Sequence, residues 1–328
     1  MAIYLIQIVS LLIISFILIN VYFLIADNFN IIDKPNHRSS HSLITIRGGG
    51  IIIPVVFIVY ELINYMPDPF FMAGLIIISV VSFIDDVRGL PSVYRLAAQM
   101  TAVMLMLFDG GITSFILGVL MLIIITGFIN GYNFMDGING ITGVYSLIIT
   151  LTLFVVNDFV FQFIDNKIFI YLIIPVFVFL FYNFRVKAKC FAGDVGSVSL
   201  AFIISFMMLL LIIKSGNLFY LFFVAVYGID IVFTIIQRLL LKQNILEAHR
   251  MHLYQILANE AGLSHKSVTL LYGMLQLLIN SIVIVVSLSD LTSVEKWIVC
   301  GLLLVLLIVL YLIVKRRLMI RYNIDFKK

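Results

Sequence analysis

Long apolar segments alternate with short polar ones along the whole chain. The apolar segments approach the ~20 residues that a helix needs to cross a bilayer. Gly-Gly, Pro-Asp-Pro and Asp-Gly-Gly breaks separate them. The pattern predicts an all-α fold, a polytopic bundle of about eleven membrane-spanning helices. We expect these spans at residues 4–26, 49–65, 70–84, 93–108, 113–130, 139–156, 167–184, 197–213, 218–240, 268–288 and 294–314.

Composition agrees with a membrane protein. Of the 328 residues, 63% are hydrophobic, against about half in a soluble domain, and the mean hydropathy is +1.18. No polar stretch is long enough for a soluble domain, so residues 1–328 are expected to form one integral-membrane domain. The first apolar segment lacks a preceding basic residue and a cleavage site, which predicts a retained helix. Cys190 and Cys300 have no CxxC partner, so neither a disulfide framework nor a zinc site is expected.

Basic residues are distributed unequally between the two sides of this bundle. Of the 21 Lys and Arg residues, 18 fall on the side that follows odd-numbered spans and carries the C-terminal tail. The remaining three, Lys167, Lys214 and Lys296, fall on the other side. The positive-inside rule therefore predicts an external N-terminus and a cytoplasmic C-terminus. All five histidines fall on the cytoplasmic side too.

The polar stretch at residues 130–140 lies between the fifth and sixth apolar segments. Asn133 and Asp136 are three residues apart, so a helical turn would place both on one face. Gly137 and Gly140 let the backbone approach a ligand closely. A carboxylate and an amide oxygen suit a hard cation such as Mg²⁺. Taken alone, a polar hairpin between two membrane helices explains the stretch equally well.

Asp85 and Asp86 form an adjacent carboxylate pair at the end of the third apolar segment. Such a pair needs a cation or a base nearby before both members ionise, and membrane carboxylates are functional by default. The pair could supply a general base, a metal ligand or both, whereas the structural alternative is an acidic cap at the interface. Arg95 follows in the next span and could bind a phosphate or extend to the interface.

Two glycine-rich segments precede apolar spans. Asp194 lies in Gly-Asp-Val-Gly-Ser, where a carboxylate at a helix start could hold a metal and free N–H groups could bind phosphate. Ordinary N-capping is the alternative. Arg47 precedes Gly48–Gly50, which is not a Walker loop because no Lys-Ser/Thr follows. The amides of this run could still bind an anion.

The longest polar loop, about residues 242–266, contains His-Arg-Met-His-Leu-Tyr-Gln. His249 and His252 are three residues apart, which would put them on one face of a helical turn, with Arg250 beside them. Zinc would need further ligands and HExxH is absent, so Arg and His donors better suit a diphosphate. A membrane-surface amphipathic helix is the alternative. Asp230, inside the ninth span, is a further candidate.

Together these groups place metal ligands, a carboxylate pair and anion donors on one face of an apolar bundle. That arrangement suits a reaction between a lipid phosphate and a nucleotide-diphosphate substrate. The chain resembles the polyprenyl-phosphate N-acetylhexosamine-1-phosphate transferases, the family of WecA, TagO and MraY. Five motifs carry the resemblance, in the family's order: DKPNHRSSHSLITIRGGG, DDVRGL, NFMDGINGITG, NFRVKAKCFAGDVGS and HRMHLYQ.

The resemblance implies transfer of N-acetylhexosamine 1-phosphate from a UDP-sugar to undecaprenyl phosphate, with release of UMP. It implies a cytoplasmic active site in the bacterial inner membrane, with Mg²⁺, or Mn²⁺ in its place, bound by Asn133 and Asp194. The catalytic residues that it implies are Asp85, Asp86 and Asp136. The residues that it implies for binding the diphosphate or the sugar are Arg47, Arg95, His249, Arg250 and His252.

Two departures from the family leave the sugar open. The first loop has Thr45-Ile46 where many relatives have Thr-Pro, and the last motif ends in Tyr254-Gln255 where WecA-like members have further histidines. The HRxHxYQ form is closer to the WbpL-like branch, which initiates O-antigen synthesis for lipopolysaccharide. GlcNAc and 6-deoxy sugars such as N-acetylfucosamine or N-acetylquinovosamine all remain candidates. The missing His-His-His tract argues against MraY itself.

Other classes of protein fit less well. A secondary transporter using Asp230 would gather polar groups near the bilayer midplane within paired repeats, whereas here they gather at one face. A scaffold for envelope assembly would need neither the Asp pair nor the Gly-Asp-Val-Gly loop. The expected partners are the UDP-sugar, the lipid acceptor and membrane lipid, with no nucleic acid; a homodimer stays open. Direct attack by the lipid phosphate and a covalent aspartyl intermediate are competing routes.

Overall fold

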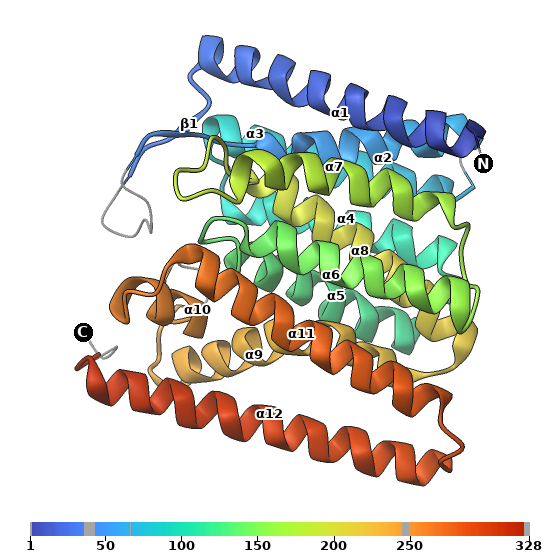
Figure 1. The fold of residues 1–328 in the computed structure, drawn as a ribbon, viewed down its shortest axis with the longest axis vertical. Helices are drawn as coiled ribbons and strands as arrows, with labels where there is room; N and C mark the ends of the chain where they lie inside the picture. The colour runs from blue at the N-terminus through green and yellow to red at the C-terminus, as the bar shows by residue number, and fades with distance from the viewer. Residues whose placement is uncertain (1, 36–42, 66, 245–248, 325–328) are drawn as a thin grey trace.

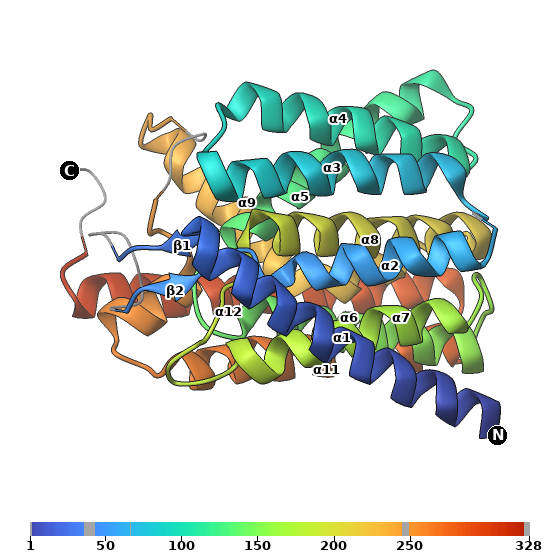
Figure 2. The same cartoon turned by 90° about the horizontal axis from the view of Figure 1, so that it is seen from above.

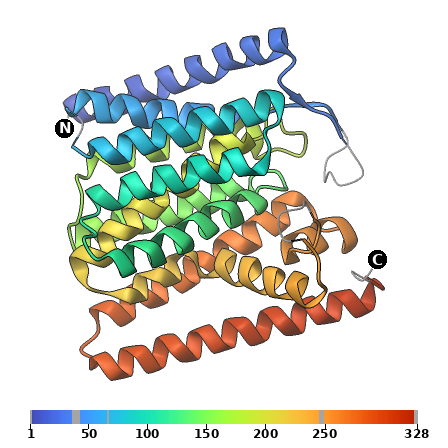
Figure 3. The same ribbon diagram turned by 180° about the vertical axis from the view of Figure 1, so that it is seen from behind.

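The computed structural model describes residues 2–35, 43–65, 67–244 and 249–324. Within these ranges, eleven long helices run side by side, with α1 at one edge of the bundle and α12 at the other (Figures 1 and 3). They are α1 (Ala2–Phe29), α2 (Ile52–Ile63), α3 (Pro69–Arg88), α4 (Ser92–Asp109), α5 (Phe115–Phe134), α6 (Ile141–Phe159), α7 (Lys167–Asn183), α8 (Gly193–Ser215), α9 (Ala225–Leu240), α11 (His265–Leu288) and α12 (Ser293–Arg321).

Short elements complete the chain. Strands β1 (Ile32–Asp33) and β2 (Thr45–Ile46) pair antiparallel. Short 3-10 helices precede α2 and α9, namely η1 (Gly49–Ile51) and η2 (Leu218–Val224). The loop before α11 contains α10 (Leu253–Gln255) and the π-helical turn η3 (Ile256–Glu260).

The prediction of an all-α polytopic membrane protein is confirmed. Each expected span overlaps one long helix, and eight helical segments of the described chain are long and apolar enough to cross a bilayer. These eight are α1, α3, α5, α6, α8, η2 with α9, α11 and α12, while η1–α2 and α7 are shorter apolar helices. The number of crossings and the orientation remain predictions. Cys190 and Cys300 are free and buried.

Helix α8 forms the centre of the bundle (Figure 2). It is apolar on all sides, as expected of a helix surrounded by other helices, and 89% of its spanning segment is buried. Phe71 of α3 stacks on its Phe202 and Phe206. At its start, a Cβ on Gly196 would come within 2.8 Å of the Gly50 Cα, so the first loop can approach α8 only because both residues are glycine.

The polar ends of several helices meet at one end of the bundle. Strands β1 and β2, α10 and the C-terminal end of α12 lie at this end, and the N-terminal end of α1 lies at the other (Figure 1). The C-terminal ends of α3 and α5 and the start of α8 carry the carboxylates and the amide singled out from sequence. The fold therefore gathers these groups, although they are far apart along the chain.

Candidate active site

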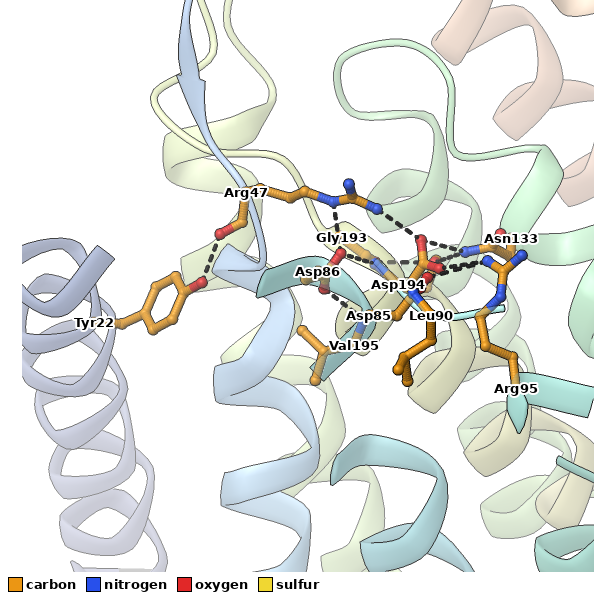
Figure 4. A network of polar contacts seen from close by, with 11 residues as sticks. Tyr22, Arg47, Asp85, Asp86, Leu90, Arg95, Asn133, Gly193, Asp194 and Val195 are labelled. Atoms are coloured by element: carbon orange, nitrogen blue, oxygen red, sulfur yellow. Dashed lines mark hydrogen bonds and ion pairs between the residues drawn. The ribbon is translucent and has the colours of Figure 1, made fainter. Parts of the chain in front are cut away.

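Asp86 caps the start of α8. It is buried at the end of α3, and its Oδ1 accepts the Asp194 N–H at 2.9 Å while its Oδ2 accepts the Val195 N–H at 3.0 Å (Figure 4). Arg47 Nε donates to Oδ1 at 2.7 Å. The expectation that these α8 amides bind a substrate phosphate is therefore wrong, because a carboxylate of the protein already accepts from them.

The glycine amides of the first loop are also used within the protein. Gly49 N–H donates to the Phe191 carbonyl at 2.8 Å and Gly50 N–H to the Ala192 carbonyl at 3.1 Å. The expectation of an anion site at these amides is wrong, since backbone pairing satisfies both donors. Instead they tie the first loop to the segment before α8, which places Arg47 beside Asp86 and Asp194.

The Asp85 side chain has different hydrogen-bond partners from the adjacent Asp86. It is buried and accepts the Leu90 N–H and Arg95 Nη1, the latter at 3.1 Å. The same Arg95 Nη1 lies 3.2 Å from Asp194 Oδ2, while Arg47 Nη2 lies 3.4 Å from Asp194 Oδ1. Two guanidinium groups thus link three carboxylates in one network (Figure 4).

Asn133 and Asp194 are brought together as predicted from the sequence motifs. Asn133 Nδ2, at the end of α5, lies 3.2 Å from Asp194 Oδ1 and 2.8 Å from Ser197 Oγ. Contacts of 3.2–3.4 Å to Asp194 are longer than the 2.7–2.9 Å typical of charge-assisted hydrogen bonds. The Asp194 carboxylate thus has long contacts to Arg47, Arg95 and Asn133, and the Asp85 carboxyl group is a further hydrogen-bonding neighbour.

This donor set fits Mg²⁺. Among the residues that the structure describes, no three His, Cys, Asp or Glu side chains form a ready-made metal cage. Mg²⁺ does not require one, because it typically takes one or two carboxylates together with substrate phosphates and water. Asp194 offers a carboxylate at a helix junction, and the Asn133 amide, whose Nδ2 lies 3.2 Å from it, would offer its oxygen to a metal if the amide turned by 180°. Asp85 is next to them.

Asp136 lies just beyond α5, where its Oδ1 accepts the Thr142 hydroxyl at 2.6 Å. Burial raises the pKa of Asp136 to about 6. It is not on the same helical face as Asn133, because α5 ends at Phe134. Both nevertheless line a polar cavity of about 260 Å³, together with Arg47, Phe191, Asp194 and Gln255.

A second cavity, of about 390 Å³, is lined mainly by apolar side chains of α3, α4, α5, α8 and α9. Its walls include Ile78, Leu96 and Ile231. Its basic lining residues are Arg95, Arg238, His249 and His252. Asn133 and Asp194 line this cavity as well as the polar one. The two cavities therefore meet at the residues predicted to bind metal.

The His-Arg-Met-His segment is not helical before Leu253, so the expected helical face is wrong. His252 is the N-cap of α10 instead, and its ring centroid lies 4.9 Å from that of His249. Burial, together with the neighbouring His252, lowers the pKa of His249 to about 3. Arg250 is half-buried in this segment and is not among the lining residues of either cavity. Residues 36–42 of the first motif lie outside the described residues.

Several lining residues escaped the sequence analysis. Arg238 counted there only as a topological charge, yet it lines the apolar cavity. Phe191 belongs to the motif around Asp194, so its position in that motif was a usable signal. Gln255 of the HRMHLYQ motif lines the polar cavity, and so does His265. His265 lies outside the five motifs, so no local pattern marked it.

Comparison with known proteins supports a membrane-embedded phosphoglycosyltransferase. A model of glycosyl transferase family 4 matches residues 69–212. A probable undecaprenyl-phosphate N-acetylglucosaminyl 1-phosphate transferase of Bacillus subtilis (strain 168) is 29% identical over 272 residues, covering 76% of this chain and 75% of the relative. An undecaprenyl-phosphate alpha-N-acetylglucosaminyl 1-phosphate transferase of Thermotoga maritima is 27% identical over 258 residues, covering 76% and 80%. These matches support the resemblance to the polyprenyl-phosphate N-acetylhexosamine-1-phosphate transferase family that the five motifs indicate.

Proposed function

We propose that this protein transfers N-acetylhexosamine 1-phosphate from a UDP-sugar to undecaprenyl phosphate and releases UMP. The observation that carries the proposal is that Asn133 and Asp194 line both a polar and an apolar cavity. A water-soluble donor and a lipid acceptor need separate sites that share one wall, and the reacting phosphates must meet at that wall. The names of the two relatives support the same reaction.

The polar cavity suits the nucleotide sugar. Arg47 supplies a guanidinium for the diphosphate, and Phe191 supplies a ring for a base or sugar face. The amide side chain of Gln255 can pair with a hydroxyl or carbonyl group. Asn183 supports the cavity wall instead, because it accepts the Gly140 N–H and donates to the Cys190 carbonyl. Asp136, at the same cavity, is a candidate acceptor for a sugar or uracil N–H group.

The apolar cavity suits the lipid acceptor. Its aliphatic walls fit an isoprenoid chain, and Arg95, Arg238 and His252 are cationic or hydrogen-bonding groups for the phosphate. Three of these walls come from α4, α5 and α9, which carry exposed apolar side chains elsewhere, such as Met104, Ile123 and Val232. The acceptor can therefore bind with its tail in the membrane and its phosphate next to Asp194.

The proposed chemistry is direct displacement. Asn133 and Asp194 would hold Mg²⁺, or Mn²⁺, which when bound offsets the charge of the diphosphate. An oxygen of the lipid phosphate attacks the β-phosphorus, a new P–O bond forms, and the bond to UMP breaks. Arg47 and Arg95 stabilise the equatorial oxygens, because each already faces Asp194.

Asp85 and Asp86 differ in their fitness for proton transfer. Asp86 accepts two backbone N–H groups and Arg47, which leaves little capacity for a substrate proton. Asp85 is next to Arg95, a lining residue of the lipid cavity, and is the better candidate to accept a proton from the lipid phosphate or to orient it. The same comparison makes Asp85, rather than Asp86, the candidate nucleophile if the reaction takes a covalent route.

The biological setting is also a proposal. The excess of basic residues supports an active site facing the cytoplasm of the bacterial inner membrane. GlcNAc is the first sugar to test because both relatives are named for it. The HRxHxYQ motif supports a role in initiating O-antigen or another envelope glycan, with 6-deoxy N-acetylated sugars as the next candidates.

The decisive experiment combines a substrate panel with one matched pair of variants. Purified protein is incubated with undecaprenyl phosphate, each UDP-sugar, and Mg²⁺, Mn²⁺ or EDTA, while UMP release and the lipid product are measured. Asp194→Asn should abolish turnover, whereas Asp290→Asn, at an exposed site in the loop before α12, should not. The proposal fails if no UDP-N-acetylhexosamine yields UMP, or if Asp194→Asn retains full activity.

A further inference from the structure

Asp230 of α9 is a buried carboxylate that five hydrogen-bond donors surround. Its side chain accepts the Leu253 N–H at 3.0 Å and the Tyr254 N–H at 3.5 Å. Tyr272 of α11 donates to it at 2.8 Å and Tyr311 of α12 at 3.1 Å, and Thr234 lies 3.2 Å away. Because Asp230 is 1% exposed and lines neither cavity, it is not placed to touch substrate.

His252 connects this carboxylate to the lipid cavity. Its Nδ1 lies 3.4 Å from Asp230 Oδ1. The residue is 2% exposed, and neither ring nitrogen forms an aligned hydrogen bond within the described part of the chain. The same side chain lines the apolar cavity with Arg95 and Asp194. One edge of the His252 imidazole thus faces Asp230. The His252 side chain also lines the apolar cavity that we assign to the lipid acceptor.

We propose that Asp230 is a positioning residue that holds His252 Nδ1 and the start of α10, so that His252 presents Nε2 to the phosphate of the lipid acceptor. The inference rests on the proposed function, because that function assigns the lipid phosphate to this cavity. His252 contacts the substrate, and Asp230 acts through it.

The chemistry of imidazole explains why a carboxylate is needed there. The two ring nitrogens are distinct, and a carboxylate facing Nδ1 keeps the proton on that atom. Nε2 is then the atom left for the substrate, and when it also carries a proton it donates to a phosphate oxygen. Where a histidine acts through one nitrogen, a carboxylate on the other fixes both tautomer and ring orientation.

Lys315 of α12 lies next to the hydroxyl groups that contact Asp230. Lys315 Nζ of α12 donates to Thr234 Oγ1 at 3.0 Å and to the Tyr311 hydroxyl at 2.8 Å, and both hydroxyls contact Asp230. The other charged or titratable groups around the imidazole are Arg238 of α9, His249 and Arg250 of the same segment, Tyr254, Tyr272, Arg95 and Asp194. Because its pairing is internal, Asp230 lacks the solvent access that an ion-coupled transporter would require of it.

The kinetic test is a double-mutant cycle on Asp230→Asn and His252→Gln. Asn keeps the volume and one acceptor oxygen but can donate to Nδ1, which reverses the tautomer. Asp230→Asn should lower kcat by about 10- to 100-fold, with the KM for the UDP-sugar changed less than about threefold. In the His252→Gln background it should cost nothing further, because its effect passes through His252. Additive losses would overturn the inference.

A matched control separates positioning from general loosening of the bundle. Thr152→Val removes a buried hydroxyl that bonds Asn280 and the Ile148 carbonyl in another part of the bundle. It should melt at about the same temperature as Asp230→Asn and keep wild-type kcat. Equal loss of kcat in both variants would show that Asp230 serves stability alone.

A second measurement, by NMR, tests the inference without an activity assay. In protein labelled with [¹⁵N]histidine, with His252→Gln used for assignment, NMR should show a proton on Nδ1 of His252 in the wild type. It should show that proton lost in Asp230→Asn. A wild type protonated on Nε2 alone, or the same state in both proteins, would contradict the proposal. If the wild type releases no UMP, the proposed function is refuted. The NMR experiment still tests whether Asp230 keeps the proton on His252 Nδ1, because it does not depend on turnover.

Discussion

Asp86 Oδ1 accepts the backbone N–H of Asp194 at 2.9 Å, although the two residues are 108 positions apart in sequence. The bond fixes the first turn of α8 to the last turn of α3, and Arg47 donates to both carboxylates across it. The position of the Asp194 carboxylate, and with it the shared wall of the two cavities, therefore depends on Asp86. Because Asp86 caps α8 and Asp194 lines the cavities, substitutions of the two carboxylates should have different effects on stability.

Asp86→Asn should be destabilised more than Asp194→Asn. The Asn side chain has one carbonyl oxygen in place of two charged oxygens, so it cannot accept from both α8 amides and Arg47. Losing such buried partners costs about 1–3 kcal/mol. Thermal unfolding in detergent should show a clear drop for Asp86→Asn and a smaller one for Asp194→Asn, with UMP release lost in both. Equal melting temperatures for Asp86→Asn and the wild type would refute the capping role.

Arg47→Lys should reduce activity although the charge is kept. Arg47 reaches Asp86 through Nε and Asp194 through Nη2, and an ammonium group cannot span two carboxylates in this way. We expect kcat/KM for the UDP-sugar to fall by about 10-fold or more. Arg88→Lys, at an exposed position in the last turn of α3, is the matched control and should behave as the wild type. Equal kcat/KM values in the two variants would argue against the bridging role.

Gly127→Leu should block the lipid acceptor selectively. Gly127 lines the apolar cavity, and a Cβ built there meets nothing within 4 Å, so a larger side chain fills space without a clash. The KM for undecaprenyl phosphate should rise by about 10-fold, with the KM for the UDP-sugar unchanged. Gly301→Leu, on an exposed face of α12 that is equally open, is the control. If only the KM for the UDP-sugar changes, the apolar cavity does not bind the lipid acceptor.

The stability of the protein should depend on pH through Asp136. Burial raises its pKa from an ordinary value of 3.8 to about 6. Between these values the folded state binds more protons than the unfolded state, so stability falls as pH rises from about 4 through about 6. Asp136→Asn removes this dependence, because the amide does not ionise.

Thermal unfolding in EDTA without substrate tests this prediction. The melting temperature of Asp136→Asn minus that of the wild type should grow between pH 4 and 7. Asp290→Asn should show no such trend, since Asp290 is exposed. A constant difference across the range would show that Asp136 does not ionise with the raised pKa.

The sequence predicts the helices well because their determinant is local. Runs of about 20 apolar residues can satisfy their backbone in a bilayer only as helices, and every expected span overlaps a helix. The gathering of Asn133 and Asp194 follows from motifs at the ends of those helices. The site could be assembled from sequence to that extent.

The partners of individual groups could not be predicted. Whether the Gly49 amide meets an anion or the Phe191 carbonyl depends on packing between segments far apart in sequence. The same holds for Asp230, whose donors come from α11, α12 and the α10 turn. The spacing of His249 and His252 indicated a helical face, but the helix begins only after His252, with its backbone set by Asp230.

Under the proposed function, the apolar cavity has a consequence for where the isoprenoid travels. Several of its walls belong to helices that carry exposed apolar side chains, and Gly127 in its lining is itself exposed. A long tail can thus remain dissolved in hydrocarbon from arrival to departure, while only its headgroup moves against Asp194. Each methylene kept out of water avoids about 0.8 kcal/mol of unfavourable hydration, so the enzyme never has to extract its most insoluble reactant.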